Sequence, residues 1–459
     1  MELLLNFITK FNDVLWNSVL LFLLLGTGLY FTIKLKFVQI RKFGEGFKKI
    51  FGGMNLKGKK AGKDGMSSFQ AVATAIAGQV GTGNLAGAAT AIVSGGPGAI
   101  FWMWVSAFFG MATIYAEAVL AQLFKTKVDG EVTGGPAYYI RNGIKNEKVA
   151  SFLAGFFAIC CVLACGFMGS VVQANSISDA FSNAFGISPL IVGIVVAALG
   201  AFIFFGGMGR IASVTEKLVP LMAGFYIVAG LIIIGFNGSQ IIPAFKAIIL
   251  GAFNPKAVMG GAIGITIRNA VRYGVARGMF SNEAGMGSTP HAHAVAKVKH
   301  PSEQGAVAIV SVFIDTFLVL TLTALVILTS GAWKIEGIQG ITLTQKAFEL
   351  TLGGMGQGFV AICLFFFAFS TIIGWYFYGE ANMKYLFGKK SLNLYRILVI
   401  LVIVVGSTLK VELVWQLADT FNGFMVIPNL IGLLALSGIV AKTMKEYENI
   451  KEENNGIDL

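Results

Sequence analysis

The long apolar runs of this chain restrict its fold more than any other feature of the sequence. A run of about 18 or more apolar residues crosses the roughly 30 Å hydrocarbon core of a bilayer as a helix. Eleven such runs occur, separated by short polar stretches, at 13–36, 67–93, 97–124, 149–184, 188–206, 211–235, 256–290, 303–330, 353–388, 391–409 and 412–441. They fill most of the 459 residues and leave no room for a sizeable soluble domain. The sequence therefore predicts an all-α integral membrane protein with about 11 transmembrane helices.

The positive charge of the chain is concentrated in its predicted loops. Lys and Arg outnumber Asp and Glu by 35 to 23, and ten of the basic residues lie between Lys34 and Lys63, beside the acids Glu45 and Asp64. Because cytoplasmic loops carry an excess of Lys and Arg, this loop is predicted to lie inside the cell. The N-terminus then lies outside, and the tail 442–459 lies in the cytoplasm. The charge thus reports orientation in the cell membrane, and we expect lipid, not nucleic acid, as a partner.

Within this basic loop, Phe37, Ile40, Phe47, Ile50 and Phe51 recur at near-helical spacing beside basic residues. The pattern is typical of a short amphipathic helix lying on anionic headgroups. A solvated linker between two spans has the same composition, so both interpretations stay open.

Residue sets that carry enzyme chemistry do not occur in the sequence at the expected spacings. His291, His293 and His300 follow the seventh run without an H-E-x-x-H pattern or a thiolate partner. They are predicted to be loop histidines and not zinc ligands. A nucleophile elbow of the G-x-S-x-G type is also missing. We therefore expect a protein that is not an enzyme and that uses no cofactor.

The second apolar run contains an unusual group of glycines. Four glycines between Gly78 and Gly87 surround Thr82 and Asn84. Each glycine costs about 1 kcal/mol in a helix interior, so four in mid-membrane predict a helix that is interrupted there. The alternative is close helix packing, because Gly83 and Gly87 form a G-x-x-x-G contact motif. The polar side chains, placed where backbone groups would come free, favour the interruption.

The seventh run repeats this pattern. The segment Arg277–Pro290 reads RGMFSNEAGMGSTP and is polar and glycine-rich inside a run that must cross the membrane. Irregular backbone cannot face lipid, so we expect residues 280–285 to be non-helical and shielded from lipid. The two interruptions are five spans apart and therefore enter the membrane from opposite sides. This arrangement predicts an inverted five-plus-five repeat, in which the free amides and carbonyls of broken helices bind a carboxylate and a cation.

Several motifs resemble one family over nearly the whole chain. They are GQVGTGNLAG at 78–87, SGGPGAIFWMW at 94–104, TGGP at 133–136, VQANS at 172–176 and FSNEAG at 280–285. With these motifs the chain resembles the sodium:alanine (alanine or glycine:cation) symporter family from about residue 13 to residue 440. The resemblance implies a LeuT-type ten-helix core with one extra N-terminal helix. It also implies sodium-coupled symport of alanine or glycine into the cell by alternating access, with sodium as the coupling ion.

This fold divides the chain into five parts. They are an accessory N-terminal transmembrane helix (1–36), a basic cytoplasmic amphipathic loop (37–66), a first five-helix repeat (67–236), a second five-helix repeat (237–441) and a cytoplasmic tail (442–459).

The resemblance also implies residues that contact the substrate. In LeuT-type transporters, main-chain groups of a glycine-rich break that ends in Gly-Asn contact the substrate carboxylate. The implied substrate contacts here are Gly81, Thr82, Gly83 and Asn84 in the first break. Further candidates for lining the substrate follow from their own positions in the sequence: Gln173 on the fourth span, Phe280 and Ser281 in the second break, and Trp375 on the ninth span. For Gln173 a packed amide, and for Trp375 an ordinary core aromatic, are the alternatives.

The implied sodium site lies between the second and ninth spans. In the LeuT-type fold, sodium bridges carbonyls just before the break to groups on the eighth core helix. The corresponding positions are the carbonyls of Ala77 and Val80, the hydroxyls of Ser370 and Thr371, and the carbonyl of Phe367.

Ionisable residues inside the spans form a further set of candidates. Each costs roughly 2.5–3.5 kcal/mol on insertion scales and is functional by default. The candidates are Glu117, Glu283, Asp315, Glu380 and Asp419, although those near span ends have an interfacial alternative. The arginine that forms an outer gate elsewhere in the fold is missing after Asn84, and Arg268, Arg272 or Arg277 paired with Asp419 is the substitute.

Two other transport classes share part of the pattern. A proton-coupled transporter of small amino acids would have the same broken helices. A channel would need a polar filter that is open through the membrane, whereas the polar groups here cluster at two breaks flanked by apolar sequence.

Overall fold

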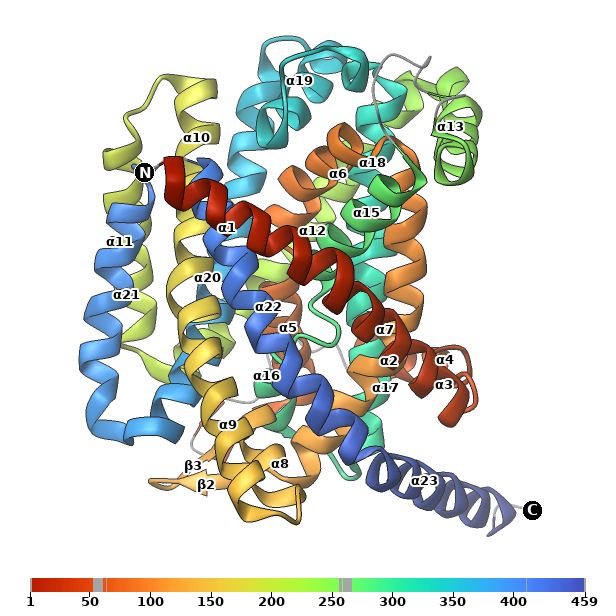
Figure 1. Ribbon diagram of the computed structural model, residues 1–459, viewed down its shortest axis with the longest axis vertical. Coiled ribbons are helices and arrows are strands. Elements are labelled where there is room, and N and C mark those ends of the chain that lie inside the picture. The colour runs from red at the N-terminus through yellow and green to blue at the C-terminus, as the bar shows by residue number, and fades with distance from the viewer. Residues whose placement is uncertain are drawn as a thin grey trace.

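The structure is a computed structural model that describes residues 2–52, 61–62, 64–255, 258, 266–409 and 411–457. Helices dominate this part of the chain, and the assigned strands form two short pairs (Figure 1). Among the described residues, seven helical stretches are long and apolar enough to cross a membrane: Leu5–Lys34, Gly98–Leu123, Glu147–Phe185, Gly207–Phe236, Pro301–Thr329, Met355–Phe387 and Val414–Ala435. The predicted all-helical architecture is confirmed.

The difference between these seven stretches and the eleven predicted spans has a physical cause. Helices α11 (Pro189–Phe204) and α21 (Leu392–Gly406) have 16 and 15 residues, fewer than a full crossing needs. The predicted spans 67–93 and 256–290 are interrupted, and residues 259–265 of the latter lie outside the described part of the chain.

Three of the long stretches contain a π-helical segment, which widens the helix locally and often marks a functional site. They are α1 (Glu2–Val14), η1 (Leu15–Leu20) and α2 (Leu21–Lys34); α9 (Glu147–Cys161), η3 (Val162–Gly169) and α10 (Ser170–Phe185); and α17 (Pro301–Val312), η5 (Phe313–Leu320) and α18 (Thr321–Thr329).

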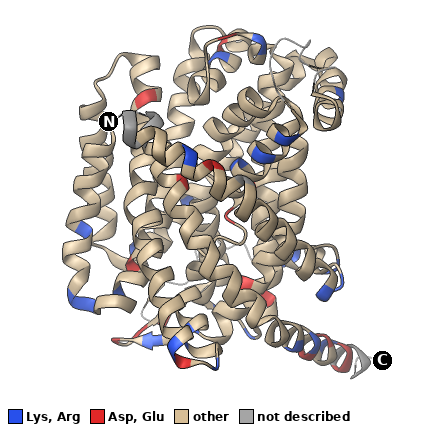
Figure 2. Cartoon of the chain, viewed as in Figure 1, with Lys and Arg blue, Asp and Glu red and all other residues tan. Residues whose placement is uncertain are grey.

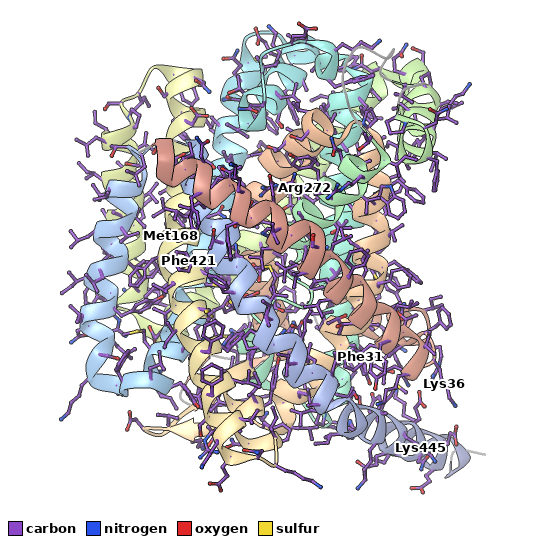
Figure 3. The ribbon with its side chains drawn as sticks, viewed as in Figure 1. Phe31, Lys36, Met168, Arg272, Phe421 and Lys445 are labelled. Atoms are coloured by element: carbon purple, nitrogen blue, oxygen red, sulfur yellow. The ribbon has the colours of Figure 1, made fainter. Side chains whose placement is uncertain are left out.

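The N-terminal helix α1–η1–α2 runs diagonally across one face of the bundle (Figure 1). It packs on α22 (Val411–Ala435) and on α7 (Gly98–Leu123). The Asn12 side chain donates to the carbonyl oxygen of Gln416 at 2.8 Å, and Asp13 forms an ion pair with Arg272, which is labelled in Figure 3. Polar contacts therefore attach this helix to the bundle in addition to its apolar packing.

Two interrupted helices cross the interior of the bundle in opposite directions. The first consists of α5 (Ser68–Gln79), η2 (Gly83–Gly87) and α6 (Ala88–Gly95), and the second of α15 (Ile267–Asn282) and α16 (Pro290–Ala294). In Figure 1, α5 and α16 lie in the lower half, whereas α6 and α15 lie in the upper half. A capping box starts α5, because the Ser67 hydroxyl accepts from the Gln70 amide and the Gln70 side chain accepts from the Ser67 amide.

The remaining helices surround this pair or cover the ends of the bundle. They are α8 (Pro136–Gly143), α12 (Gly207–Phe236), η4 (Gly238–Gln240), α13 (Ile241–Phe253), η6 (Ala332–Lys334), α19 (Gly340–Leu352), α20 (Met355–Phe387) and η7 (Lys389–Ser391). Helices α13 and α19 lie at the upper end in Figure 1 and follow the predicted spans 211–235 and 303–330.

Four short strands lie near the ends of these helices. Strand β1 (Met66–Ser67) pairs in parallel with β4 (Ala296–Lys297), in the register Met66 to Ala296. This pair joins the start of α5 to the segment that follows α16. Strands β2 (Thr126–Val128) and β3 (Glu131–Thr133) form an antiparallel hairpin at the lower end in Figure 1.

The predicted basic loop contains two helices, α3 (Val38–Arg41) and α4 (Phe43–Gly52), while residues 53–60 and 63 lie outside the described part of the chain. The terminal helix α23 (Ser437–Ile457) bonds to this region, because Lys451 lies 2.7 Å from Glu45 and Tyr447 also donates to Glu45. Burial opposes ionisation of Glu45, but the hydrogen bonds from Lys451 and Tyr447 outweigh it and lower the pKa of this carboxyl. Most charged residues of the protein lie at the two ends of the bundle or on α23 (Figure 2).

Candidate functional site

The first interruption lies at Gly81 and Thr82, between α5 and η2. Val80 leaves the helix with an extended backbone, at φ −80° and ψ 92°. The Gly81 amide donates to Oδ1 of Asn84 at 2.9 Å, and the Thr82 amide donates to Oε1 of Gln173 at 3.2 Å. These four predicted substrate contacts lie together, and the protein's own side chains accept from two of the amides that the break frees.

Five oxygen atoms converge between α5 and α20 just before this break. Oγ1 of Thr371 lies 3.0 Å from the carbonyl oxygen of Ala77 and 3.4 Å from that of Val80. Oγ of Ser370 lies 3.3 Å from the carbonyl oxygen of Ala77 and 2.8 Å from that of Phe367. All five residues are buried. Carbonyl and hydroxyl oxygens are ligands that hard cations prefer, and this set carries no formal charge.

The second interruption begins later than expected. The prediction of a non-helical segment is wrong for residues 280–282, because α15 continues to Asn282. Glu283 ends the helix by taking a left-handed backbone, with φ 59°, and irregular backbone follows. Phe280 and Ser281 therefore lie in the last helical turn, and both are buried.

Asp315, on η5, connects the two breaks. Its Oδ1 accepts from the Asn84 side-chain amide at 2.7 Å and from the Ser281 hydroxyl at 3.0 Å. The backbones also approach closely, since a Cβ atom added to Gly83 would lie 2.8 Å from the Cα atom of Ser281. A glycine at 83 is therefore a geometric requirement of the contact between the broken helices.

Gln79 forms a second connection between the breaks and has an unpaired acceptor. Its amide nitrogen donates to the carbonyl oxygen of Asn282 at 2.7 Å. Oε1 of Gln79 and Oγ1 of Thr82 are buried and have no hydrogen-bond partner among the described residues. Buried polar atoms are nearly always paired, so these two oxygens are available to accept a hydrogen bond from a ligand or a water molecule.

Glu117, on α7, holds the irregular backbone of the second break. Its carboxylate accepts from the amides of Gly285 at 3.1 Å and Gly287 at 2.9 Å, and from the Asn429 side chain at 2.7 Å. The sequence marked Glu117 as a candidate through its charge. It gave no signal for Asn429, which lies in no recognisable motif.

An ion pair and aromatic rings cover the site on the side of α15. Arg277 binds Asp419 through two hydrogen bonds, of 2.6 and 3.1 Å, and its guanidinium lies 5.1 Å from the ring centre of Trp415. The Phe280 ring lies 5.1 Å from that of Trp415 and 5.8 Å from that of Trp375. Of the three arginines considered for Asp419, the structure places Arg277 beside it.

Two other predicted features lie elsewhere. Glu380 lies 3.6 Å from Lys384 and 3.7 Å from Arg396, in an ion network away from the breaks. The prediction of loop histidines is wrong for His291 and His293, which are buried in α16. The chain forms the short helix α16 inside the bundle after the second break, so these two histidines do not lie in a loop. The described residues contain no cluster of His, Cys, Asp and Glu that could hold a metal ion.

The sequence matches the sodium:alanine symporter family over residues 1–458. It is 45% identical to the sodium/alanine symporter AgcS of Methanococcus maripaludis, covering 97% of this chain and 98% of that protein. It is 41% identical to the probable sodium/glutamine symporter GlnT of Bacillus subtilis, over 96% of this chain and 90% of that protein. Among solved structures, a manganese transporter of Eremococcus coleocola superposes with a TM-score of 0.54 at 15% identity, covering 79% and 77%. At that identity the likeness concerns the fold alone.

Proposed function

Because the chain belongs to the sodium:alanine symporter family, we propose that it imports alanine or glycine together with sodium by alternating access. The family is one of transporters, and the apolar helices make the protein a multi-pass membrane protein. The observation that carries the proposal is the meeting of two interrupted helices, at Gly83 and Ser281 and through Asp315. The first of these helices also carries two buried oxygens, of Gln79 and Thr82, that have no partner among the described residues. We assign the two helices to a LeuT-type inverted repeat of five plus five helices, preceded by α1–η1–α2 and divided as the sequence predicts. Their opposite directions through the bundle support this assignment.

The coupling sodium is proposed to bind between Ala77, Val80, Phe367, Ser370 and Thr371. The convergence of five oxygens within the distances given above supports this position. The two hydroxyls now donate to carbonyl oxygens, and rotation of each O–H would turn its lone pairs toward a cation. The site then stabilises sodium without burying a second formal charge.

The substrate carboxylate is proposed to bind the amides of Gly81, Thr82 and Gly83. Asn84 and Gln173, which accept from the first two amides, would release them to the carboxylate. Since one relative is named for glutamine, the family does not by itself fix the size of the substrate, and walls such as Trp375 must do so in this chain.

We propose that the protein lies in the cell membrane with its N-terminus outside the cell and α23 in the cytoplasm. The basic residues of α3 and α4 support it, because they lie at the same end of the bundle as α23. In this orientation the Arg277–Asp419 pair and the ring of Trp415 close the outer path to the site. The β1–β4 pair lies at the cytoplasmic ends of both broken helices, and we propose that it separates when the inner path opens.

Competition experiments test the proposed substrate. Removing the carboxylate leaves buried amides unpaired at a cost of about 1–3 kcal/mol. We expect alanine methyl ester to compete with labelled alanine at least about tenfold more weakly than alanine does. Leucine should compete poorly as well, because Trp375 occupies the space of a long side chain. If either compound competes as well as alanine, the proposed mode of recognition is wrong.

A cysteine at position 281 tests whether the second break lines the substrate path. We expect a water-soluble thiol reagent to modify Ser281→Cys slowly, and more slowly still when alanine and sodium are both present. Ser151, at the exposed start of α9, provides the control, because modification of Ser151→Cys should not respond to either solute. Equal rates at position 281 with and without the two solutes would argue against the proposed site.

A further inference from the structure

Glu283 is a buried acid for which the proposed function gives no role. Its side chain is fully buried in the centre of the bundle, directly after the last turn of α15. Its carboxylate accepts from two neutral donors, the indole N–H of Trp375 and, at 2.6 Å, the hydroxyl of Ser288. A buried carboxylate is costly unless it is well hydrogen-bonded, so these two contacts are the main support of the group in the part of the chain that the structure describes.

The indole of Trp375 lies next to the proposed carboxylate site. Thr371, one turn earlier on α20, contacts the carbonyl oxygen of Val80, and a Cβ atom added to Gly81 would lie 2.3 Å from Oγ1 of Thr371. Four residues of helix advance about 6 Å. Trp375 therefore lies one turn of α20 from the residue that contacts Gly81, close enough to wall the pocket of a small amino acid whose carboxylate binds there.

Gly169, on η3, packs directly against the ring of Trp375. A Cβ atom added to Gly169 would lie 1.8 Å from Cε3 of the Trp375 ring, so the ring fills the space that any side chain at 169 would need. Gly169 lies one turn before Gln173, which accepts from the Thr82 amide. Phe280 packs edge to face against the same indole at 5.8 Å. The ring is thus packed on two sides and fixed at its N–H by Glu283.

We propose that Glu283 is a positioning residue for substrate size: its carboxylate holds the Trp375 indole against Gly169, where the ring excludes amino acids with side chains longer than a methyl group. This inference rests on the proposed function, because it uses the same substrate site. It gives the second broken helix a role in selecting the size of the substrate, in addition to its proposed role in closing the outer path to the site. The indole has one donor, and losing its acceptor frees the ring to turn away from the pocket.

A matched pair of substitutions isolates the hydrogen bond. Glu283→Gln keeps the length of the side chain and an acceptor oxygen, and its amide can donate to the Ser288 hydroxyl. Glu283→Met keeps a similar length but offers no comparable acceptor. We expect Glu283→Gln to retain the wild-type preference for alanine over leucine, measured as the ratio of their inhibition constants against labelled alanine. We expect Glu283→Met to reduce this ratio at least tenfold.

Trp375→Phe removes the donor from the other side of the same bond. It should reduce the ratio as Glu283→Met does, and the double variant should resemble Trp375→Phe within about twofold. An unchanged ratio in Glu283→Met, or a much larger change in the double variant than in Trp375→Phe alone, would overturn the inference. Should Glu283→Met fail to fold, Trp375→Phe and Glu283→Gln decide the question, since an unchanged ratio in Trp375→Phe also overturns it. Wild-type protein that shows no sodium-driven alanine uptake would instead contradict the proposed function.

Discussion

Removing both hydroxyls of the proposed cation site, as Ser370→Ala with Thr371→Val, is expected to raise the sodium concentration for half-maximal alanine uptake by at least tenfold. The double variant keeps the volume of the two side chains nearly unchanged but removes two of five converging oxygens. A tenfold rise corresponds to about 1.4 kcal/mol, a moderate loss for two ligands of a desolvated cation. Alanine binding should remain measurable at saturating sodium, because the substrate contacts are intact.

The chain offers a matched control for this double variant. Ser407 and Thr408 form a second Ser-Thr pair, at the end of α21, and their hydroxyls donate to Val404 and Val405 of their own helix at 2.7 and 2.8 Å. Ser407→Ala with Thr408→Val should leave the sodium dependence as in the wild type. A wild-type sodium dependence in Ser370→Ala with Thr371→Val would mean that the cation binds elsewhere. The carbonyl of Gln79 and the side chain of Asn84 would then be the next candidates.

The substitution Gly83→Ala is also expected to reduce alanine uptake strongly, although it adds only one methyl group. In Gly83→Ala the added Cβ atom would lie 2.8 Å from the Cα atom of Ser281 and 3.0 Å from its Cβ atom. Backbone cannot move aside as a flexible side chain can, so the two broken helices must separate. Overpacking of this kind costs about 1–3 kcal/mol, and we expect uptake at low alanine concentration to fall by about 10- to 100-fold.

Gly87 provides the control for this substitution on the same interrupted helix. A Cβ atom added at Gly87 would meet its nearest neighbour, the carbonyl oxygen of Thr82, at 3.9 Å, which is an ordinary contact. Gly87→Ala should therefore transport alanine within about twofold of the wild type. Equal losses in Gly83→Ala and Gly87→Ala would show that the helix-contact motif matters as a whole, and that the specific approach to Ser281 does not.

The sequence predicts the helical architecture and the first break well, because both follow from local chemistry. Apolar runs require helices in lipid, and the glycines around Thr82 disfavour a continuous helix. The structure also brings together the five residues of the proposed cation site. That grouping came from the resemblance to a family, since two hydroxyls on a distant helix carry no local signal of their own.

Other features depend on long-range contacts that the sequence does not display. The second break starts at Glu283, although neighbouring Gly285 and Gly287 are the residues that most readily adopt such a backbone. Glu117 binds the irregular backbone at Gly285 and Gly287, and Asp315 binds Asn84 and Ser281 of the two broken helices. These partners are far away in the sequence, so the charge of the two acids indicated importance without indicating a role. His291 and His293 looked like loop residues because a buried helix as short as α16 has no periodicity from which it can be recognised.

Accumulation of labelled alanine by the purified protein in proteoliposomes tests the central proposal most directly. One sodium ion crossing 100 mV gains about 2.3 kcal/mol, and a tenfold sodium gradient adds about 1.4 kcal/mol. With both applied inward, we expect alanine to accumulate far above its outside concentration and to leave again when the sodium gradient is collapsed. Accumulation that follows a proton gradient in the absence of sodium, or a conductance without accumulation, would contradict sodium-coupled symport.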